Sequence, residues 1–154
     1  MTAAPAYHGI TNDEIQEFPF EGGTLRLLTG EYKGHKGWQG KYMPLDYYDI
    51  HMNPGAKLTL DVKPENTVMV FTLVGDVVAG GSHVEPKTAA RLVDGNTVTI
   101  EAGKDGAEVM LMSALALHEP IAWYGPIVMN TQSEIRTAIH ELNDGTFVKQ
   151  NTEY

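Results

Sequence analysis

The spacing of apolar residues along most of the chain is typical of β-strands. Residues 57–63 alternate strictly, with Leu58, Leu60 and Val62 on one face and polar side chains on the other, which is the period of a half-buried strand. Residues 67–74 are mostly apolar without interruption, which predicts a strand buried on both faces. Short strands that recur roughly every 8–12 residues between turns indicate a sandwich or barrel. Strands are predicted at residues 24–29, 47–52, 57–63, 67–74, 77–81, 89–93, 97–101 and 107–115.

A glycine-rich stretch at residues 30–40 follows the first of these strands. It lacks the Gly-Lys-Ser/Thr ending of a phosphate-binding loop and does not lead from a strand into a helix. A hairpin is therefore the better prediction. Near the other end of the chain, residues 123–129 are apolar and aromatic with a Gly-Pro break, and we expect an extended segment that crosses the domain.

The pattern changes to that of a helix after this segment. Thr131 and Glu134 have the Thr-x-x-Glu spacing of a capping box, and Gly145 suits the left-handed residue that follows a helix. Between them the apolar positions recur at helical spacing, and we expect this stripe to seal the barrel. Its members are Ile135, Ala138, Ile139 and Leu142.

Composition and charge exclude several classes of function. A chain of 154 residues suits one domain. Its formal net charge of −9 argues against nucleic acid or an anionic membrane as a partner, because both bind basic surfaces. The absence of cysteine excludes disulfides and thiolate metal ligands. No apolar run approaches the ~18 residues of a membrane span, and the N-terminus lacks a signal-peptide pattern, so we expect a cytoplasmic protein.

Three segments of the sequence together resemble one known family. They are residues 29–34 with the glycines that follow, residues 47–56, and residues 118–136, where the match continues to the Gly-Thr-Phe of residues 145–147. With the order of strands and turn glycines, they resemble a cupin barrel and, more narrowly, the C-terminal domain of the pirin family. The resemblance implies an all-β fold, namely a single cupin barrel (a double-stranded β-helix or jelly roll) with a C-terminal α-helix.

The same resemblance sets expectations about domain organisation. It implies an N-terminal arm at residues 1–17, a cupin domain at residues 18–148 and a tail at residues 149–154. Pirins usually have two cupin domains, and the iron site and quercetinase-type chemistry of the family belong to the N-terminal one. The match here is to the C-terminal domain.

The metal-binding motif of cupins does not fit this sequence. When the motif is laid on the chain from Gly55, its two histidine positions fall on Asp61 and Lys63, and the later histidine position falls on Gly106. An ammonium group and a glycine cannot ligate a divalent ion. The six histidines form no His-x-His pair. We therefore expect a metal-independent domain with no cofactor.

Several polar side chains are nevertheless candidates for a small-molecule site. Tyr47, Asp49 and His51 share one face of a predicted strand, which could line a barrel mouth, although a solvent-facing strand edge is the simpler interpretation. A His–Asp pair in a pocket could carry out general acid–base chemistry. Lys63 could act as an amine if desolvated, but its polar face favours solvation. The ligand-pocket candidates are Tyr47, Asp49, His51, Asp61 and Lys63.

Two kinds of function remain open at this point. The first is a binding module, which would hold a small molecule in the barrel or another protein on an exposed surface, and which we expect to form a homodimer. The second is a small-molecule enzyme on the cupin frame, either a dioxygenase of the quercetinase kind or a metal-independent acid–base catalyst. A role as partner of a transcription factor follows only from family analogy.

Overall fold

A computed structural model describes residues 7–149 of the chain, and it divides into two compact units. Residues 10–116 form the larger unit, which carries the strands of the barrel. Residues 117–149, together with residues 7–9, belong to the smaller unit. Each unit is described by itself. The outermost parts of the predicted arm and tail, residues 1–6 and 150–154, lie outside the described range.

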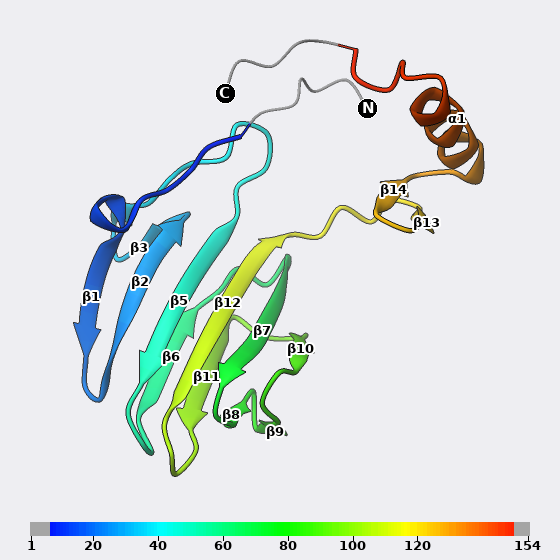
Figure 1. The fold of residues 1–154 in the computed structure, drawn as a ribbon. Helices are drawn as coiled ribbons and strands as arrows, with labels where there is room; N and C mark the ends of the chain where they lie inside the picture. The colour runs from blue at the N-terminus through cyan, green and yellow to red at the C-terminus, as the bar shows by residue number, and fades with distance from the viewer. Residues whose placement is uncertain (1–6, 150–154) are drawn as a thin grey trace. The chain divides into compact units, whose positions relative to one another are not determined.

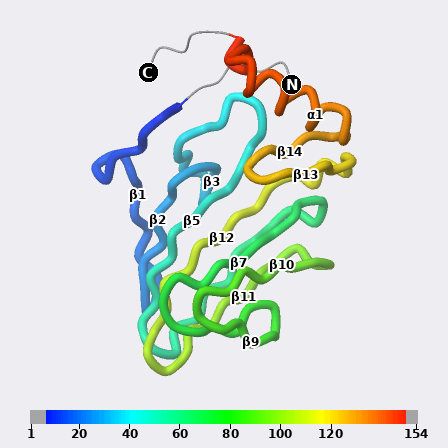
Figure 2. The backbone as a smooth tube through the Cα atoms, turned by 45° about the vertical axis from the view of Figure 1, so that its right-hand side comes forward, coloured from blue at the N-terminus to red at the C-terminus, as the bar shows by residue number. Residues whose placement is uncertain are grey.

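The larger unit contains two antiparallel sheets. The six-stranded sheet has the order β1-β2-β5-β12-β7-β10 and the four-stranded sheet the order β6-β11-β8-β9. Figures 1 and 2 show β2, β5 and β12 running side by side. The strands of the first sheet are β1 (Gln16–Phe20), β2 (Gly23–Thr29), β5 (Asp46–Met52), β12 (Ala107–Leu115), β7 (Asn66–Val74) and β10 (Ala89–Leu92). Those of the second are β6 (Lys57–Asp61), β11 (Thr97–Ala102), β8 (Val77–Ala79) and β9 (Ser82–Val84).

From β5 onward the chain alternates between these two sheets, except that β8 and β9 form a hairpin within the four-stranded sheet. β5 and β7 belong to the larger sheet, whereas β6 and β8 belong to the smaller one, and β10, β11 and β12 alternate in the same way. This alternation is the jelly-roll arrangement that the resemblance implies. A separate small hairpin, β3 (Glu31–Tyr32) with β4 (His35–Lys36), occupies the glycine-rich stretch as predicted. A 3-10 helix, η1 (Asn12–Glu14), precedes β1.

The core lies between the two sheets and is made of aliphatic side chains from both. Their burial, at about 1.5–3 kcal/mol for a fully buried Val, Leu or Ile side chain, is the main stabilising contribution to the unit. The six-stranded sheet contributes Leu25, Ile50, Val70, Val109 and Leu111, and the four-stranded sheet contributes Leu58, Leu60, Val77, Val98 and Ile100. Each of these residues alternates with polar or partly exposed neighbours, in accordance with the two-residue period of a strand.

Strand β7 departs from the prediction that it is buried on both faces. Val68, Val70 and Thr72 point into the core, whereas Met69 and Phe71 on the other face stay partly exposed. This alternation cannot be recognised in the sequence, because large apolar side chains occupy both faces of the strand. Buried Thr72 is satisfied within the chain, since its hydroxyl donates a hydrogen bond of 2.6 Å to the Glu85 carbonyl.

The smaller unit is a β-hairpin followed by a helix, and residues 117–149 are called the hairpin–helix unit below. Strands β13 (Ala122–Tyr124) and β14 (Ile127–Met129) pair with each other. The expected single extended crossing is therefore wrong. The Gly-Pro break is the hairpin turn, where Gly125 has a φ of 56°, and the segment folds back on itself.

The predicted helix is confirmed as α1 (Gln132–Asn143). The backbone amide of Glu134 donates to the Thr131 hydroxyl at 3.2 Å, and the Thr131 amide donates to the Glu134 carboxylate at 2.8 Å, which is the predicted capping box. Hydrogen bonding to Thr131 lowers the pKa of Glu134. Gly145 has the expected positive φ of 70°. Within the described residues, no helix is long and apolar enough to cross a membrane.

The apolar stripe of α1 is only partly buried. Ile135 and Ala138 are buried, whereas Leu142 is 49% exposed. Within its unit, α1 contacts β13 and β14. That the stripe seals the barrel therefore remains a prediction.

Candidate functional site

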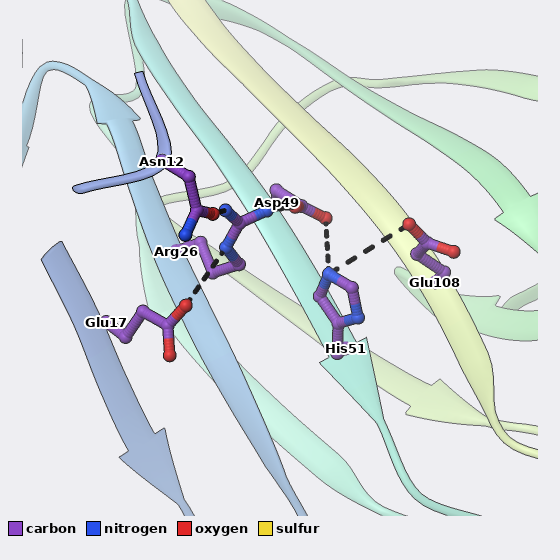
Figure 3. Close-up of polar contacts among 6 residues, drawn as sticks. All are labelled: Asn12, Glu17, Arg26, Asp49, His51 and Glu108. Atoms are coloured by element: carbon purple, nitrogen blue, oxygen red, sulfur yellow. Dashed lines mark hydrogen bonds and ion pairs between the residues drawn. The ribbon is translucent and has the colours of Figure 1, made fainter. Parts of the chain in front are cut away.

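A polar cluster lies on the outer face of the six-stranded sheet, which is the face turned away from the core. Strand register creates it, because Arg26 on β2 lies directly opposite Asp49 on β5, and Glu108 on β12 lies directly opposite His51. Figure 3 shows these side chains turned toward one another, together with Glu17 and Asn12. Tyr48, Ile50 and Met52 alternate with them and face the core.

Asp49 is the buried centre of the cluster. It is 7% exposed, and its Oδ2 accepts a 2.7 Å hydrogen bond from the Arg26 guanidinium. Arg26 in turn contacts Glu17 at 3.2 Å and the side-chain oxygen of Asn12 at 2.6 Å. The hydrogen bond with Asp49 is the largest cause that raises the pKa of Arg26. Arg26 is therefore held in place by three side chains.

The second oxygen of Asp49 is not satisfied in the same way. Oδ1 is buried and accepts no hydrogen bond from the part of the chain that the structure describes. The Nε2 atom of His51 lies 3.1 Å from it, as a close polar contact outside hydrogen-bond geometry. The same Nε2 lies 3.9 Å from Oε1 of Glu108. A carboxylate oxygen, an imidazole nitrogen and a second carboxylate oxygen thus converge.

A shallow depression borders this cluster. Its volume is ≈ 420 Å³, and its wall includes His51 and Glu108 together with Thr24, Asn53 and Asp105. Groups approaching from solvent can reach the imidazole, whose side chain is 48% exposed. The arrangement can bind a cation, or it can transfer a proton through His51 with Asp49 as the orienting carboxylate.

The structure divides the five ligand-pocket candidates between two regions. Asp49 and His51 are brought together, and Tyr47 lies on the same outer face next to Met112. Asp61 ends β6 in the other sheet and is exposed, as is Lys63 beyond it. Exposure of Lys63 leaves its ammonium hydrated, so the desolvation that a catalytic amine needs is not met there.

A second hollow, of ≈ 390 Å³, opens between the sheets at one end of the core. Val68, Ala79 and Val98 form its apolar floor, and Arg91 and Asp94 are charged groups on its wall. None of the five candidates lines it. This hollow offers space for a small molecule within the described part of the barrel.

The positions of the cupin metal motif do not fit a metal in this fold. Asp61 and Lys63 are exposed on the polar side of the four-stranded sheet, and Gly106 has no side chain to offer. We therefore derive no chemistry from a metal at the motif positions.

Arg26 and Glu108 were not among the residues selected from the sequence. A signal was present, because each is a charged residue inside an otherwise apolar strand, Thr-Leu-Arg-Leu-Leu and Ala-Glu-Val-Met-Leu. What the sequence lacks is the strand register that places them opposite Asp49 and His51.

Comparisons with known proteins agree with this fold. The family model of the pirin C-terminal cupin domain matches residues 47–148. Human pirin is 33% identical over 141 residues, which are 88% of this chain and 48% of pirin. The crystal structure of a quercetin 2,3-dioxygenase from Acinetobacter baumannii is 34% identical with a TM-score of 0.83, and the match covers 92% of this chain and 50% of that one.

A second crystal structure of a quercetin 2,3-dioxygenase from Acinetobacter baumannii shows the same fold at 20% identity, with a TM-score of 0.75 over 91% of this chain and 47% of that one. The chain thus spans about half the length of the relatives it matches. With a mostly β structure, one described helix after the strands, and a family match over most of its length, the chain belongs to the pirin family of the cupin superfamily and has the fold of the pirin C-terminal domain.

Proposed function

We propose that this chain is a binding module that associates with a second copy of itself through the hairpin–helix unit. The observation that carries the proposal is an exposed apolar face on the β13–β14 hairpin. Trp123 and Val128 lie directly opposite each other and are 70% and 52% exposed. Ile121, two residues before Trp123, is also exposed.

The geometry of the hairpin explains why this face has no cover within the unit. Ala122 and Met129 point to the other side of the hairpin, where Ala122, Ile135 and Ala138 are buried. Side chains alternate along a strand, so the neighbours Trp123 and Val128 must point away. The indole N–H of Trp123 donates to the Gly125 carbonyl, which restrains the ring without burying it. Contiguous exposed apolar surface of this kind usually marks an interface.

The hairpin face carries no charge that would oppose a second copy there. The chain carries a formal net charge of −9, so two copies repel each other over most of their surface. The hairpin face, made of Ile121, Trp123 and Val128, is uncharged and is therefore a place where two equally acidic copies can meet. An apolar patch can also meet a second copy of itself, as a twofold interface requires, and Trp is a frequent anchor of interfaces.

The test is the oligomeric state of the full chain at micromolar concentration, measured by light scattering after gel filtration and by sedimentation equilibrium. We expect a dimer that the substitution Val128→Lys weakens by about tenfold or more, because a buried apolar contact is replaced by a desolvated charge. The matched control is Val93→Lys, at a valine that is 66% exposed on the larger unit. A monomeric wild type, or equal weakening by both substitutions, would contradict the proposal.

A second candidate function is small-molecule catalysis at the Asp49–His51 pair. The depression beside His51 favours it, as does the 34% identical relative described as a quercetin 2,3-dioxygenase. The measurement is consumption of quercetin and of oxygen by the purified chain, with the variant His51→Gln as comparison. Turnover that His51→Gln abolishes would support catalysis at this site, whereas turnover that the substitution leaves unchanged would exclude it.

A further inference from the structure

We infer that Asp49, His51 and Glu108 form a binding site for one divalent transition-metal cation on the outer face of the six-stranded sheet. The ligand atoms are Oδ1 of Asp49, Nε2 of His51 and a carboxylate oxygen of Glu108. Each lies within 4.8 Å of the other two. This site is distinct from the cupin motif positions and independent of self-association through the hairpin face.

The distances between the ligand atoms suit a cation placed among them. With metal–ligand bonds of about 2.0–2.2 Å, two ligands of a tetrahedral ion lie ~3.4 Å apart. The observed separations from His51 Nε2 are 3.1 Å to Asp49 Oδ1 and 3.9 Å to Glu108 Oε1, which bracket that value. Side-chain rotations of the half-exposed His51 and Glu108 are sufficient to close the difference.

The buried oxygen of Asp49 is an independent observation that points to a ligand. Oδ1 has no hydrogen-bond donor among the described residues, although the side chain is nine-tenths buried. Buried acceptors without a partner are rare and call for an explanation such as an ion or a water. Because Oδ1 faces His51 Nε2, a cation between them would satisfy the oxygen.

The residues behind Asp49 orient it as a metal ligand. Arg26 occupies Oδ2 at 2.7 Å, which leaves Oδ1 directed at the cluster. Carboxylates that bind metals are commonly held by such hydrogen bonds from outside the coordination shell. Glu17 contacts Arg26 at 3.2 Å and offsets its positive charge, so the two ligand carboxylates keep the local charge negative.

The ligand set indicates the class of metal. One imidazole nitrogen with two carboxylate oxygens suits zinc, manganese or ferrous iron, whereas calcium and magnesium prefer oxygen ligands alone. The neighbouring depression, with Thr24, Asn53 and Asp105 on its wall, leaves the solvent side of the ion open to water. A site with three protein ligands and an open position can exchange that water for a small ligand.

A second group of one histidine, one aspartate and one glutamate provides the matched control. His83 contacts Asp76 at 2.8 Å through Nε2 and Glu85 at 3.4 Å through Nδ1. The two carboxylates lie beside opposite nitrogens of the ring, so they do not converge on one ligand atom of His83. The composition matches that of the proposed site, but the geometry required for chelation is absent.

The experiment is titration calorimetry on the full chain without an affinity tag, after treatment with EDTA and dialysis. ZnCl₂ and MnCl₂ are the probes, and MgCl₂ is the comparison. We expect one equivalent of zinc or manganese to bind with a saturable isotherm and magnesium to bind much more weakly. His51→Gln and Glu108→Gln should each weaken binding at least about tenfold, and His83→Gln should leave it unchanged.

Both ligand variants change partly exposed side chains, and their folding is checked by thermal unfolding in EDTA. Asp49 is left intact, because its loss would leave Arg26 without its main partner. Three results would overturn the inference: no saturable binding by the wild type, undiminished binding by both ligand variants, or equal weakening by His83→Gln. In the first case the cluster would be an ion-pair network only.

Discussion

At the scale of single residues, the cluster around Asp49 shows how a charged side chain is accommodated in an apolar sheet. Asp49 occupies a position where its strand neighbours across the sheet are Arg26 and Met110. A buried carboxylate is costly unless it is paired, and Arg26 supplies the partner. The pairing satisfies one oxygen, and the other oxygen is what distinguishes this pair from a structural ion pair.

Tyr48, on the same strand, is also a buried polar side chain, but it is accommodated as a neutral group rather than as a charged one. It points into the core, where its hydroxyl donates a 2.6 Å hydrogen bond to the Glu31 carbonyl. Burial, followed by the negative charge of Asp46, raises the pKa of Tyr48 well above its usual value. The phenol is therefore a neutral structural donor rather than a catalytic group.

Gly75 allows a prediction about backbone geometry. Its φ is 69°, and a Cβ at this position would lie 2.1 Å from the carbonyl oxygen of Gly106. Gly75→Ala should lower the free energy of unfolding by about 2–4 kcal/mol, through left-handed strain and backbone overlap. The control is Gly55→Ala, with a φ of 67° and no atom within 4 Å of the added Cβ, for which about 1 kcal/mol is expected.

Urea unfolding of both glycine variants measures this difference. Equal losses would show that the loop at Gly106 moves away at no cost, and that the close approach does not constrain the residue.

At the scale of elements, the pairing between Asp76 and His83 links the start of the β8–β9 hairpin to its second strand. The Nε2 atom of His83 lies 2.8 Å from Oδ2 of Asp76. Hydrogen bonding to Asp76 is the largest cause that raises the pKa of His83, and hydrogen bonding to His83 is the largest cause that lowers the pKa of Asp76. The two pKa shifts have opposite signs, so together they define a range of pH in which both groups are charged and the pair stabilises the fold.

The stabilisation from His83 is complete below its unfolded-state pKa of about 6.5 and is lost as the pH rises through the raised folded-state pKa. The stabilisation from Asp76 is present above its unfolded-state pKa of about 3.9 and is lost as the pH falls through the lowered value. The pair should therefore contribute most between about pH 4 and pH 6.5.

His83→Gln should accordingly lower Tm at pH 5.5 and have little effect at pH 8.5. The effect should be small, because both groups are exposed and screened by solvent. Thermal unfolding in low-salt buffer at the two pH values measures it, with His83→Gln/Asp76→Asn as the partner-free reference. A difference in Tm that does not change with pH would show that the ion pair is not its cause.

At the scale of the whole molecule, the two units differ in how much core each one contains. The larger unit has a continuous aliphatic core drawn from both sheets. In the hairpin–helix unit the buried apolar residues are Ala122, Ile135 and Ala138, and α1 spans 12 residues. Isolated helices of about 12–15 residues are marginal in water, so we expect this unit to be less stable than the larger one.

This difference predicts unequal protection from hydrogen exchange. Amides of β5 and β12, which are interior strands of the six-stranded sheet, should exchange slowest, through global unfolding. Amides of α1 and β14 should exchange faster in dilute protein and become more protected as concentration rises, because self-association would cover the hairpin face. Mass-spectrometric exchange at two concentrations measures both effects. Protection of α1 equal to that of β12 at every concentration would contradict the expectation.

The sequence by itself determined the features that depend on neighbours along the chain. Alternation at residues 57–63 predicted β6, and the Thr131–Glu134 spacing predicted the start of α1, because strand faces and helix caps are set within a few residues. The sequence motif at residues 118–136 was specific enough to indicate the family. Where large apolar side chains filled both faces, as in β7, or where a Gly-Pro turn was read as a break, the local pattern was ambiguous.

The tertiary structure decided everything that depends on strand register. Register places Glu108 of β12 beside His51 of β5, and Arg26 of β2 beside Asp49, and a shift of one residue would turn each of these side chains to the other face. Register is set by how the two sheets bury their apolar faces together, which no local pattern encodes. The proposed ligand set of Asp49, His51 and Glu108 therefore forms only in the folded sheet, because the sequence places Asp49 and His51 on one strand face but does not show that Glu108 lies beside them.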